Sequence, residues 1–195
     1  MSERVGLFGG SFDPVHIGHQ HIVQSFLESD LIDTLWILPT LNPPHKNQQE
    51  LTEYSIRCEM VKAAFQNWPR VKVSLVEEHL QVPNYTLKTV QYLQDEYPQK
   101  KFLLCIGSDS LVQIATWYRY KELLDHCDLL VARRPEYDAS EVPPEARVRL
   151  VEHQPVSFSS TEIRQRISCG ESVSGLVPPE VLEVIEKYGL YNKDH

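Results

Sequence analysis

Two histidines placed three residues apart, at the start of an expected helix, are the side chains of this sequence best suited to chemistry. His16 and His19 close the segment Gly9–His19, which reads GGSFDPVHIGH. At this spacing both imidazoles share one face of the first helical turn, where they can donate hydrogen bonds to phosphate oxygens or, as cations, add positive charge. Gly9 and Gly10 carry no Cβ, so the backbone can approach a bulky anion. Together these features predict a phosphate-handling site.

The neighbours of this segment support the same interpretation. The apolar run Val5–Phe8 precedes it and the amphipathic run Ile17–Leu27 follows it. A helix that begins there offers unpaired backbone N–H groups and the positive end of its dipole to an anion. The spacing differs from the Walker loop and from the Gly-x-Gly-x-x-Gly dinucleotide fingerprint, so we expect a phosphate site of another kind.

A proline-bearing loop offers a second set of donors. The run Pro43–Lys46 reads PPHK, and its prolines stiffen the backbone that presents His45 and Lys46. Lysine binds phosphate as a point charge. The alternative is an exposed loop with a solvated lysine. Beside the Gly9–His19 segment we favour the phosphate interpretation.

Two further expected strands end in polar residues. Gly107 and Asp109 follow one of them, and the pair Arg133 and Arg134 follows the other. Asp109 could cap the next helix, accept hydrogen bonds from a ribose, or bind Mg²⁺ through water. Of the two arginines, we expect one to face the ligand and the other to be solvated.

A second helix start has the composition of an anion site. Ser159 and Glu162 form the capping-box pattern, which explains these two residues structurally. Ser160, Thr161 and Arg164 go beyond that pattern, since they add two hydroxyls and a guanidinium to the N–H groups of the helix start. The sequence thus predicts that two helix starts serve the same anion.

The elements that must position these residues alternate between strand and helix along the chain. The expected strands are Val5–Phe8, Thr34–Leu38, Val71–Val76, Phe102–Ile106, Leu129–Ala132 and Val148–Val151. The expected helices are Ile17–Leu27, Ser55–Phe65, Leu87–Asp95, Leu111–Leu124, Thr161–Ser168 and Pro179–Tyr188. This order predicts an α/β fold: one Rossmann-like domain over residues 1–195, with a mostly parallel twisted sheet, helices on both faces, and a C-terminal helical part at about residues 159–191. Ligands of such sheets bind beyond the carboxyl ends of the strands, which is where the motifs fall.

Composition narrows the function classes. The chain has 195 residues, a formal net charge of −8 and four scattered cysteines. The acidic charge argues against a nucleic-acid surface, which needs a basic stripe. No apolar run approaches the roughly 20 residues that span a bilayer, and the start MSER predicts no signal peptide. We therefore expect a cytoplasmic protein with neither membrane nor nucleic-acid partners, which concentrates positive charge locally for a small polyphosphate.

The ordered motifs resemble a known family. From Val5 to Tyr191 the chain is similar to the nucleotidyltransferases with the H-x-G-H signature and, within them, to the bacterial nicotinate-nucleotide adenylyltransferases. The segments that carry the resemblance are GGSFDPVHIGH, LPTLNPPHK, NYTLKT, CIGSDS, TWYRYKEL, ARRPEY, FSSTEIRQRI and VPPEVLEVIEKYGLY. Two positions depart from the family: Ser11 stands where threonine is common, and Lys88 stands where aspartate is frequent. Lys88 thus reverses a charge near the expected mononucleotide pocket.

The resemblance implies a reaction and a set of roles. The reaction is adenylyl transfer from ATP to nicotinate mononucleotide by direct in-line displacement, with Mg²⁺ held mainly by the ATP phosphates rather than by protein side chains. The implied catalytic residues are His16, His19, Lys46 and Arg164. The implied ATP contacts are Gly9, Gly10, Ser11, Phe12, His16, His19, Gly107, Asp109, Arg134, Ser160, Thr161 and Arg164. The implied mononucleotide contacts are His45, Lys46, Thr86, Trp117 and Tyr118. Pattern alone assigns Trp117 and Tyr118 no stacking role, because aromatic residues at helical spacing are most often core.

Several alternatives stay open at this point. Nicotinamide mononucleotide or phosphopantetheine could be the acceptor, although the segments NPPHK and TWYRYKEL disfavour the latter. A non-catalytic nucleotide-binding protein of the same fold would bind ATP without turnover. The sequence is compatible with a homo-oligomer and does not decide the oligomeric state.

Overall fold

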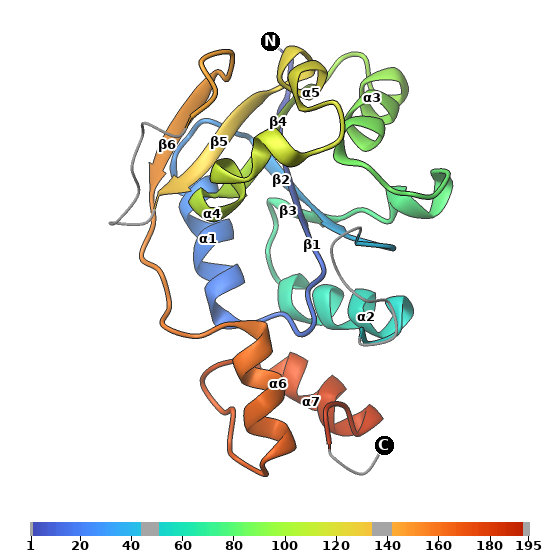
Figure 1. Ribbon diagram of the computed structural model, residues 1–195. Helices are drawn as coiled ribbons and strands as arrows, with labels where there is room; N and C mark the ends of the chain where they lie inside the picture. Colours follow the sequence, from blue (N-terminus) through green and yellow to red (C-terminus); the bar gives the residue numbers. More distant parts are fainter. Residues whose placement is uncertain (1, 44–50, 134–141, 193–195) are drawn as a thin grey trace.

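A single six-stranded sheet organises the molecule (Figure 1). The computed structural model describes residues 2–43, 51–133 and 142–192. The strands are β1 (Arg4–Gly10), β2 (Thr34–Pro39), β3 (Val71–Val73), β4 (Lys101–Gly107), β5 (Asp128–Arg133) and β6 (Val148–Glu152). Their order across the sheet is β3-β2-β1-β4-β5-β6, and every pair of neighbours is parallel. This confirms the expected α/β fold and places the strand-order switch between β1 and β4, where such folds bind ligands.

Helices and short 3₁₀ segments connect the strands. The helices are α1 (Ile17–Glu28), α2 (Tyr54–Phe65), α3 (Thr86–Glu96), α4 (Ser108–Val112), α5 (Tyr120–His126), α6 (Ser160–Ser168) and α7 (Pro179–Tyr188). The 3₁₀ segments are η2 (Val76–His79) and η3 (Ile114–Thr116). None of the described helices combines the length and apolar character that crossing a membrane requires.

The sheet separates two hydrophobic cores. Side chains alternate between the faces of each strand, so Val5 and Leu7 of β1 join one core and Phe8 joins the other. Helices α3, α4 and α5 cover the face of Val5 and Leu7, and α1, α2, α6 and α7 contribute to the core around Phe8. Strands buried on both faces read as continuous apolar runs, which is why the sequence located the central strands well.

Two expected elements differ from the structure. The strand expected at Val71–Val76 ends at Val73, because only Val71–Val73 pairs with β2, and Val76 begins η2. The helix expected at Leu111–Leu124 is broken into α4, η3 and α5, with Arg119 in the left-handed region at φ 50°. Its periodic apolar residues still reach one core, since three short helices bury them as one long helix would.

The two C-terminal helices pack against the Gly9–His19 segment and α2. In Figure 1, α6 and α7 (orange to red) lie together beyond the ends of α1 and α2. The Arg164 guanidinium of α6 donates to the backbone oxygen of Asp13 at 2.7 Å, and the Tyr191 hydroxyl donates to the Asp13 carboxylate at 2.6 Å. Asp13 itself is fully buried. The end of the chain therefore fixes the backbone of the Gly9–His19 segment.

Replacing Tyr191 by phenylalanine should destabilise the fold. Burial raises the pKa of the Tyr191 phenol, so its hydroxyl stays protonated and donates to the buried Asp13 carboxylate. Tyr191→Phe leaves that carboxylate one donor short, at a cost of about 1–3 kcal/mol in the free energy of unfolding. Urea titration measures this cost. Tyr188→Phe is the matched control, because Tyr188 is exposed and donates to Glu59 at the surface. Equal losses in the two variants would contradict the role given to Asp13.

Candidate active site

A cleft of about 700 Å³ opens at the carboxyl ends of β1, β2 and β4. Its walls include Gly9–Ser11 at the end of β1, Thr40 after β2 and Gly107 at the end of β4. The opposite wall includes Thr86 at the start of α3 and the pair Trp117–Tyr118. The structure thus brings three expected ATP-contacting glycines and three expected mononucleotide residues, Thr86, Trp117 and Tyr118, into one cavity, whose lining does not include His16, His19 or Arg164. The break in the expected helix Leu111–Leu124 is what places Trp117 and Tyr118 there, between η3 and α5.

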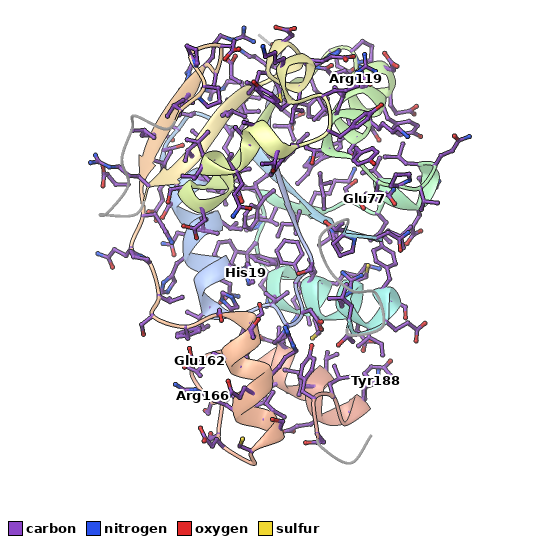
Figure 2. The ribbon with its side chains drawn as sticks, in the orientation of Figure 1. His19, Glu77, Arg119, Glu162, Arg166 and Tyr188 are labelled. Atoms are coloured by element: carbon purple, nitrogen blue, oxygen red, sulfur yellow. The ribbon has the colours of Figure 1, made fainter. Side chains whose placement is uncertain are left out.

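The two histidines of the H-x-G-H motif lie side by side at the start of α1. Their ring centroids are 3.8 Å apart, with 32° between the ring planes. The backbone N–H of His16 donates to Nδ1 of His19 at 3.1 Å. Because Nδ1 accepts, the proton of the neutral His19 imidazole is on Nε2. Figure 2 shows His19 on α1, close to the α6 end of the molecule.

His16 is uncharged at neutral pH in the ligand-free protein. Burial lowers the pKa of this imidazole to about 4. Its Nδ1 is buried and has no hydrogen-bond partner in the described parts of the chain. Of the two expected modes of action, hydrogen bonding and added charge, burial therefore favours neutral hydrogen bonding for His16.

Gly18 is required by the packing of His16. A Cβ at Gly18 would lie 2.6 Å from Cγ2 of Val156 and 3.0 Å from two ring atoms of His16. A larger side chain would first displace Val156 and would also crowd the imidazole, which accounts for the glycine inside the motif.

The start of α6 lies against the Gly9–His19 segment, as the pairing of two anion sites requires. Ser159 caps the helix by accepting from the N–H of Glu162 at 3.3 Å, but the Glu162 carboxylate accepts from Arg166 at 2.7 Å, so only the Ser159 half of the predicted capping box forms. The Ser160 hydroxyl donates to the backbone oxygen of Pro14 at 3.0 Å. Arg164 lies 3.5 Å from the Thr161 hydroxyl, to which it donates, and also bonds the Asp13 backbone. These side chains therefore hold the loop beside which a phosphate would bind.

The remaining expected site residues lie in different environments. Asp109 is exposed in the first turn of α4. The ring of Phe12 is buried and packs against His19 at a centroid distance of 5.1 Å, so only its backbone can face a ligand. Arg133 lies 3.7 Å from Glu152 of β6. His45, Lys46 and Arg134 lie outside the described residues.

Glu77 is a cleft residue that sequence reasoning missed. It is only 8% exposed, lines the cavity, and accepts from the backbone N–H of Leu41 at 2.8 Å. Burial raises the pKa of this carboxyl to about 7. In the sequence, the pair Glu77–Glu78 reads as a solvated turn, and no periodicity separates its buried member from its neighbour. Figure 2 shows Glu77 well apart from His19, on the side of the molecule away from α1.

An aromatic stack connects Lys88 to the cleft. The rings of Tyr85 and Tyr118, which both line the cavity, stack with centroids 4.1 Å apart and 14° between planes. The Lys88 ammonium lies over the Tyr85 ring, 5.7 Å from its centroid. The positive charge of Lys88, which departs from the family pattern, is therefore separated from the cavity by the Tyr85 ring.

Removing the ionisable group of Glu77 should change how stability depends on pH. The folded-state pKa of about 7 exceeds the ordinary value of 4.5, so the folded protein loses stability as the pH rises through this interval. Glu77→Gln abolishes that loss and keeps an acceptor for Leu41. Relative to wild type, the variant should gain up to about 3 kcal/mol between pH 4 and pH 8 in urea unfolding. A stability difference that is the same at both pH values would contradict the buried carboxyl.

Comparisons with known proteins agree with this geometry. Residues 7–166 match the family model described as cytidylyltransferase-like. The chain is 38% identical to a protein of Exiguobacterium sibiricum named "Probable nicotinate-nucleotide adenylyltransferase", over 96% of this chain and 98% of the relative. It is 33% identical to the nicotinate-nucleotide adenylyltransferase of Bacillus subtilis, over 97% and 98% of the two chains.

A solved structure shares the fold at lower identity. The nicotinic acid mononucleotide adenylyltransferase of Plasmodium falciparum, complexed with NaAD, superposes with a TM-score of 0.82 at 20% identity and covers 97% of both chains. The family model and the full-length relatives together show to which family the chain belongs. The chain belongs to the cytidylyltransferase-like family and, within it, to the nicotinate-nucleotide adenylyltransferases.

Proposed function

We propose that the protein transfers the adenylyl group of ATP to nicotinate mononucleotide, giving nicotinate adenine dinucleotide and pyrophosphate in NAD biosynthesis. The observation that carries this proposal is the single cleft shared by Gly9–Ser11 and by Thr86, Trp117 and Tyr118. It can hold the reacting phosphates at one end and a flat ring at the other. The names of the full-length relatives support the same reaction. We further propose a cytoplasmic location, which the free thiols of the four cysteines support.

The chemistry needs positioned donors and no general base. A phosphate monoester has a second pKa of about 6, so the attacking phosphate is mostly dianionic at neutral pH. The difficulty is the approach of one anion to another. Donors aimed at the α-phosphate and at the leaving pyrophosphate lower that barrier. His19 donates through Nε2, and the start of α6 adds N–H groups. We assign the remaining positive charge to Arg164 and Lys46.

We propose that Mg²⁺ arrives on the ATP phosphates. Within the described ranges, no group of three or more histidine, cysteine, aspartate or glutamate side chains could hold a metal ion. Asp109 at the start of α4 could reach such an ion through water. This donor set fits Mg²⁺, which keeps several waters and binds through phosphates plus one or two carboxylates. When bound, the ion supplies charge that offsets the triphosphate.

The start of α3 favours the acid form of the mononucleotide. No side chain of the described residues caps this helix, so its first N–H groups, beginning with Thr86, are available to a carboxylate. The positive end of the helix dipole and the nearby Lys88 ammonium both favour a negative group there. An uncharged carboxamide would gain neither charge interaction. The indole of Trp117, on the same wall, can stack on the pyridine ring.

Pyrophosphate release tests the proposed function. With Mg²⁺ and ATP, we expect turnover with nicotinate mononucleotide and a kcat/KM about ten-fold or more above that for nicotinamide mononucleotide, the equivalent of about 1.4 kcal/mol. Equal or reversed preference would move the substrate assignment and leave the chemistry. Turnover with phosphopantetheine alone, or ATP binding without any release, would contradict the proposal in favour of the other two alternatives.

Truncating His19 should remove a transition-state donor. His19→Ala is expected to lower kcat by roughly 10²–10³, the usual effect of losing one well-placed donor. His21→Ala is the matched control, because His21 lies exposed on the same helix and should change turnover little. Both variants should show wild-type circular dichroism. Near-normal turnover in a folded His19→Ala protein would refute the role of this imidazole.

A further inference from the structure

A buried guanidinium lies behind the wall of the cleft. Arg57 of α2 is only 1% exposed, yet it makes its hydrogen bonds to backbone carbonyls rather than to a carboxylate. Nη1 donates to Ser11 at 2.7 Å and to Thr40 at 2.9 Å. Nε donates to Thr52 at 2.9 Å, and Nη2 lies 3.4 Å from the oxygen of Leu41. One side chain therefore joins three segments that are far apart in the sequence.

Two of these segments are each held between Arg57 and an acid. Leu41 donates its N–H to Glu77 at 2.8 Å while its carbonyl faces Arg57. Thr52 donates its N–H to Asp13 at 3.3 Å while its carbonyl accepts from Arg57. We call Arg57 with Glu77 and Asp13 the backbone clamp. The clamp fixes the backbone at Leu41, after β2, and at Thr52, before α2. The side chains of Arg57, Glu77 and Asp13 are all buried.

The clamp acts on the walls of the cleft. Ser11, Thr40 and Glu77 line the cavity, whereas Arg57 reaches it only through the backbone that it holds. Nη1 alone donates to both Ser11 and Thr40, and it reinforces the bond from the Thr40 N–H to the Gly10 oxygen at 2.9 Å that also joins these two segments. Asn84 anchors the other side, since its amide donates to the backbone oxygen of Glu77 at 3.1 Å.

A purely structural role would not require a charge here. Burial lowers the pKa of Arg57 from its ordinary value, and the charge of Asp13 opposes the shift, so the guanidinium stays protonated. A buried charge whose bonds go only to carbonyls is costly, and apolar residues of similar volume often stabilise a fold better. Retaining a cation directly behind Ser11 is advantageous where anions must be held.

We infer that Arg57 and Glu77 are positioning residues for adenylyl transfer, which hold Leu41 from two sides and tie together the backbone of the cleft walls at Ser11 and Thr40. The inference rests on the proposed function. Because both residues act through the same backbone, the effects of changing them should not multiply. Misplacement of reacting groups by about 1 Å can cost 10²-fold in rate. The clamp should therefore appear in kcat rather than in the KM of either substrate.

A double-mutant cycle in pyrophosphate release tests this. Arg57→Lys keeps the charge and loses the fork, and Glu77→Ala removes the grip on the N–H of Leu41. Each folded variant is expected to lose about 10–100-fold in kcat with KM within about three-fold of wild type, and the double variant should lose little more than the stronger single one. Glu77→Gln, which keeps an acceptor for Leu41, should restore kcat to within about three-fold of wild type.

Arg70→Lys, at an exposed arginine, is the control for a stability effect alone. Arg70 also donates to three backbone carbonyls, those of Leu27, Ile32 and Asp33, but at the opposite edge of the sheet. It should lower the urea midpoint and leave kcat per folded molecule unchanged. Losses in the Arg57 and Glu77 variants that multiply, or that vanish once kcat is expressed per folded molecule, would overturn the inference.

Folding failure and inactivity are distinguished by the same experiment. If Arg57→Lys does not fold, the contrast between Glu77→Ala and Glu77→Gln decides the matter, since only the alanine releases Leu41. An inactive wild-type protein would contradict the proposed function and the inference with it. An active wild type with equal kcat in both Glu77 variants would overturn the inference alone.

Discussion

Every strand of the sheet runs in the same direction, and the rest of the molecule depends on this constraint. Parallel strands bring all of their carboxyl ends to one edge, so Gly9, Thr40 and Gly107 meet although nearly 100 residues separate them. The helices that follow begin at the same edge, so their positive dipole ends point there. An acidic chain can thereby offer the positive ends of helix dipoles at the edge where we propose that the phosphates bind.

In the described parts of the chain, helix dipoles and fixed hydrogen-bond donors provide much of the attraction for phosphate at this edge, and exposed cations provide less of it. His16 is neutral because it is buried, and His19 is held as the Nε2–H tautomer by the backbone N–H of His16. Arg164 is partly engaged with the Asp13 backbone, and Arg57 is buried behind Ser11. Preorganised groups of this kind need little rearrangement when charge shifts in the transition state.

The sequence predicted the fold well because burial on two faces leaves a strong signal. The strands β1, β2, β4 and β5 are apolar runs, and α7 begins and ends at the expected residues, where Pro179 and Gly189 mark its limits. The broken helix between Ser108 and His126 was not predictable, because its apolar spacing fits one long helix as well as three short ones. Its break places Trp117 and Tyr118 at the cleft.

The sequence predicts candidate site residues where chemistry and position coincide in a short motif. Gly9, His16 and His19 are candidates of this kind, as is the start of α6. Arg57, ahead of Met60 in the second helix, is part of the family resemblance, but the sequence predicts no role for it or for Glu77, because their roles depend on backbone carbonyls and N–H groups that only the fold brings near them. A buried arginine on a helix and an acid in a turn have the same local sequence as solvated ones.

The central claim is that the two phosphates react directly, in a cleft that supplies positioning and fixed donors and forms no covalent bond to the substrate. The stereochemistry at the α-phosphorus tests this most directly, using ATP with a sulfur of known configuration on that phosphorus. An oxygen of the mononucleotide phosphate would attack opposite the leaving pyrophosphate, so one displacement inverts the configuration. The account predicts inversion in the dinucleotide product. Retention would indicate two displacements through an adenylylated protein side chain, and would contradict it.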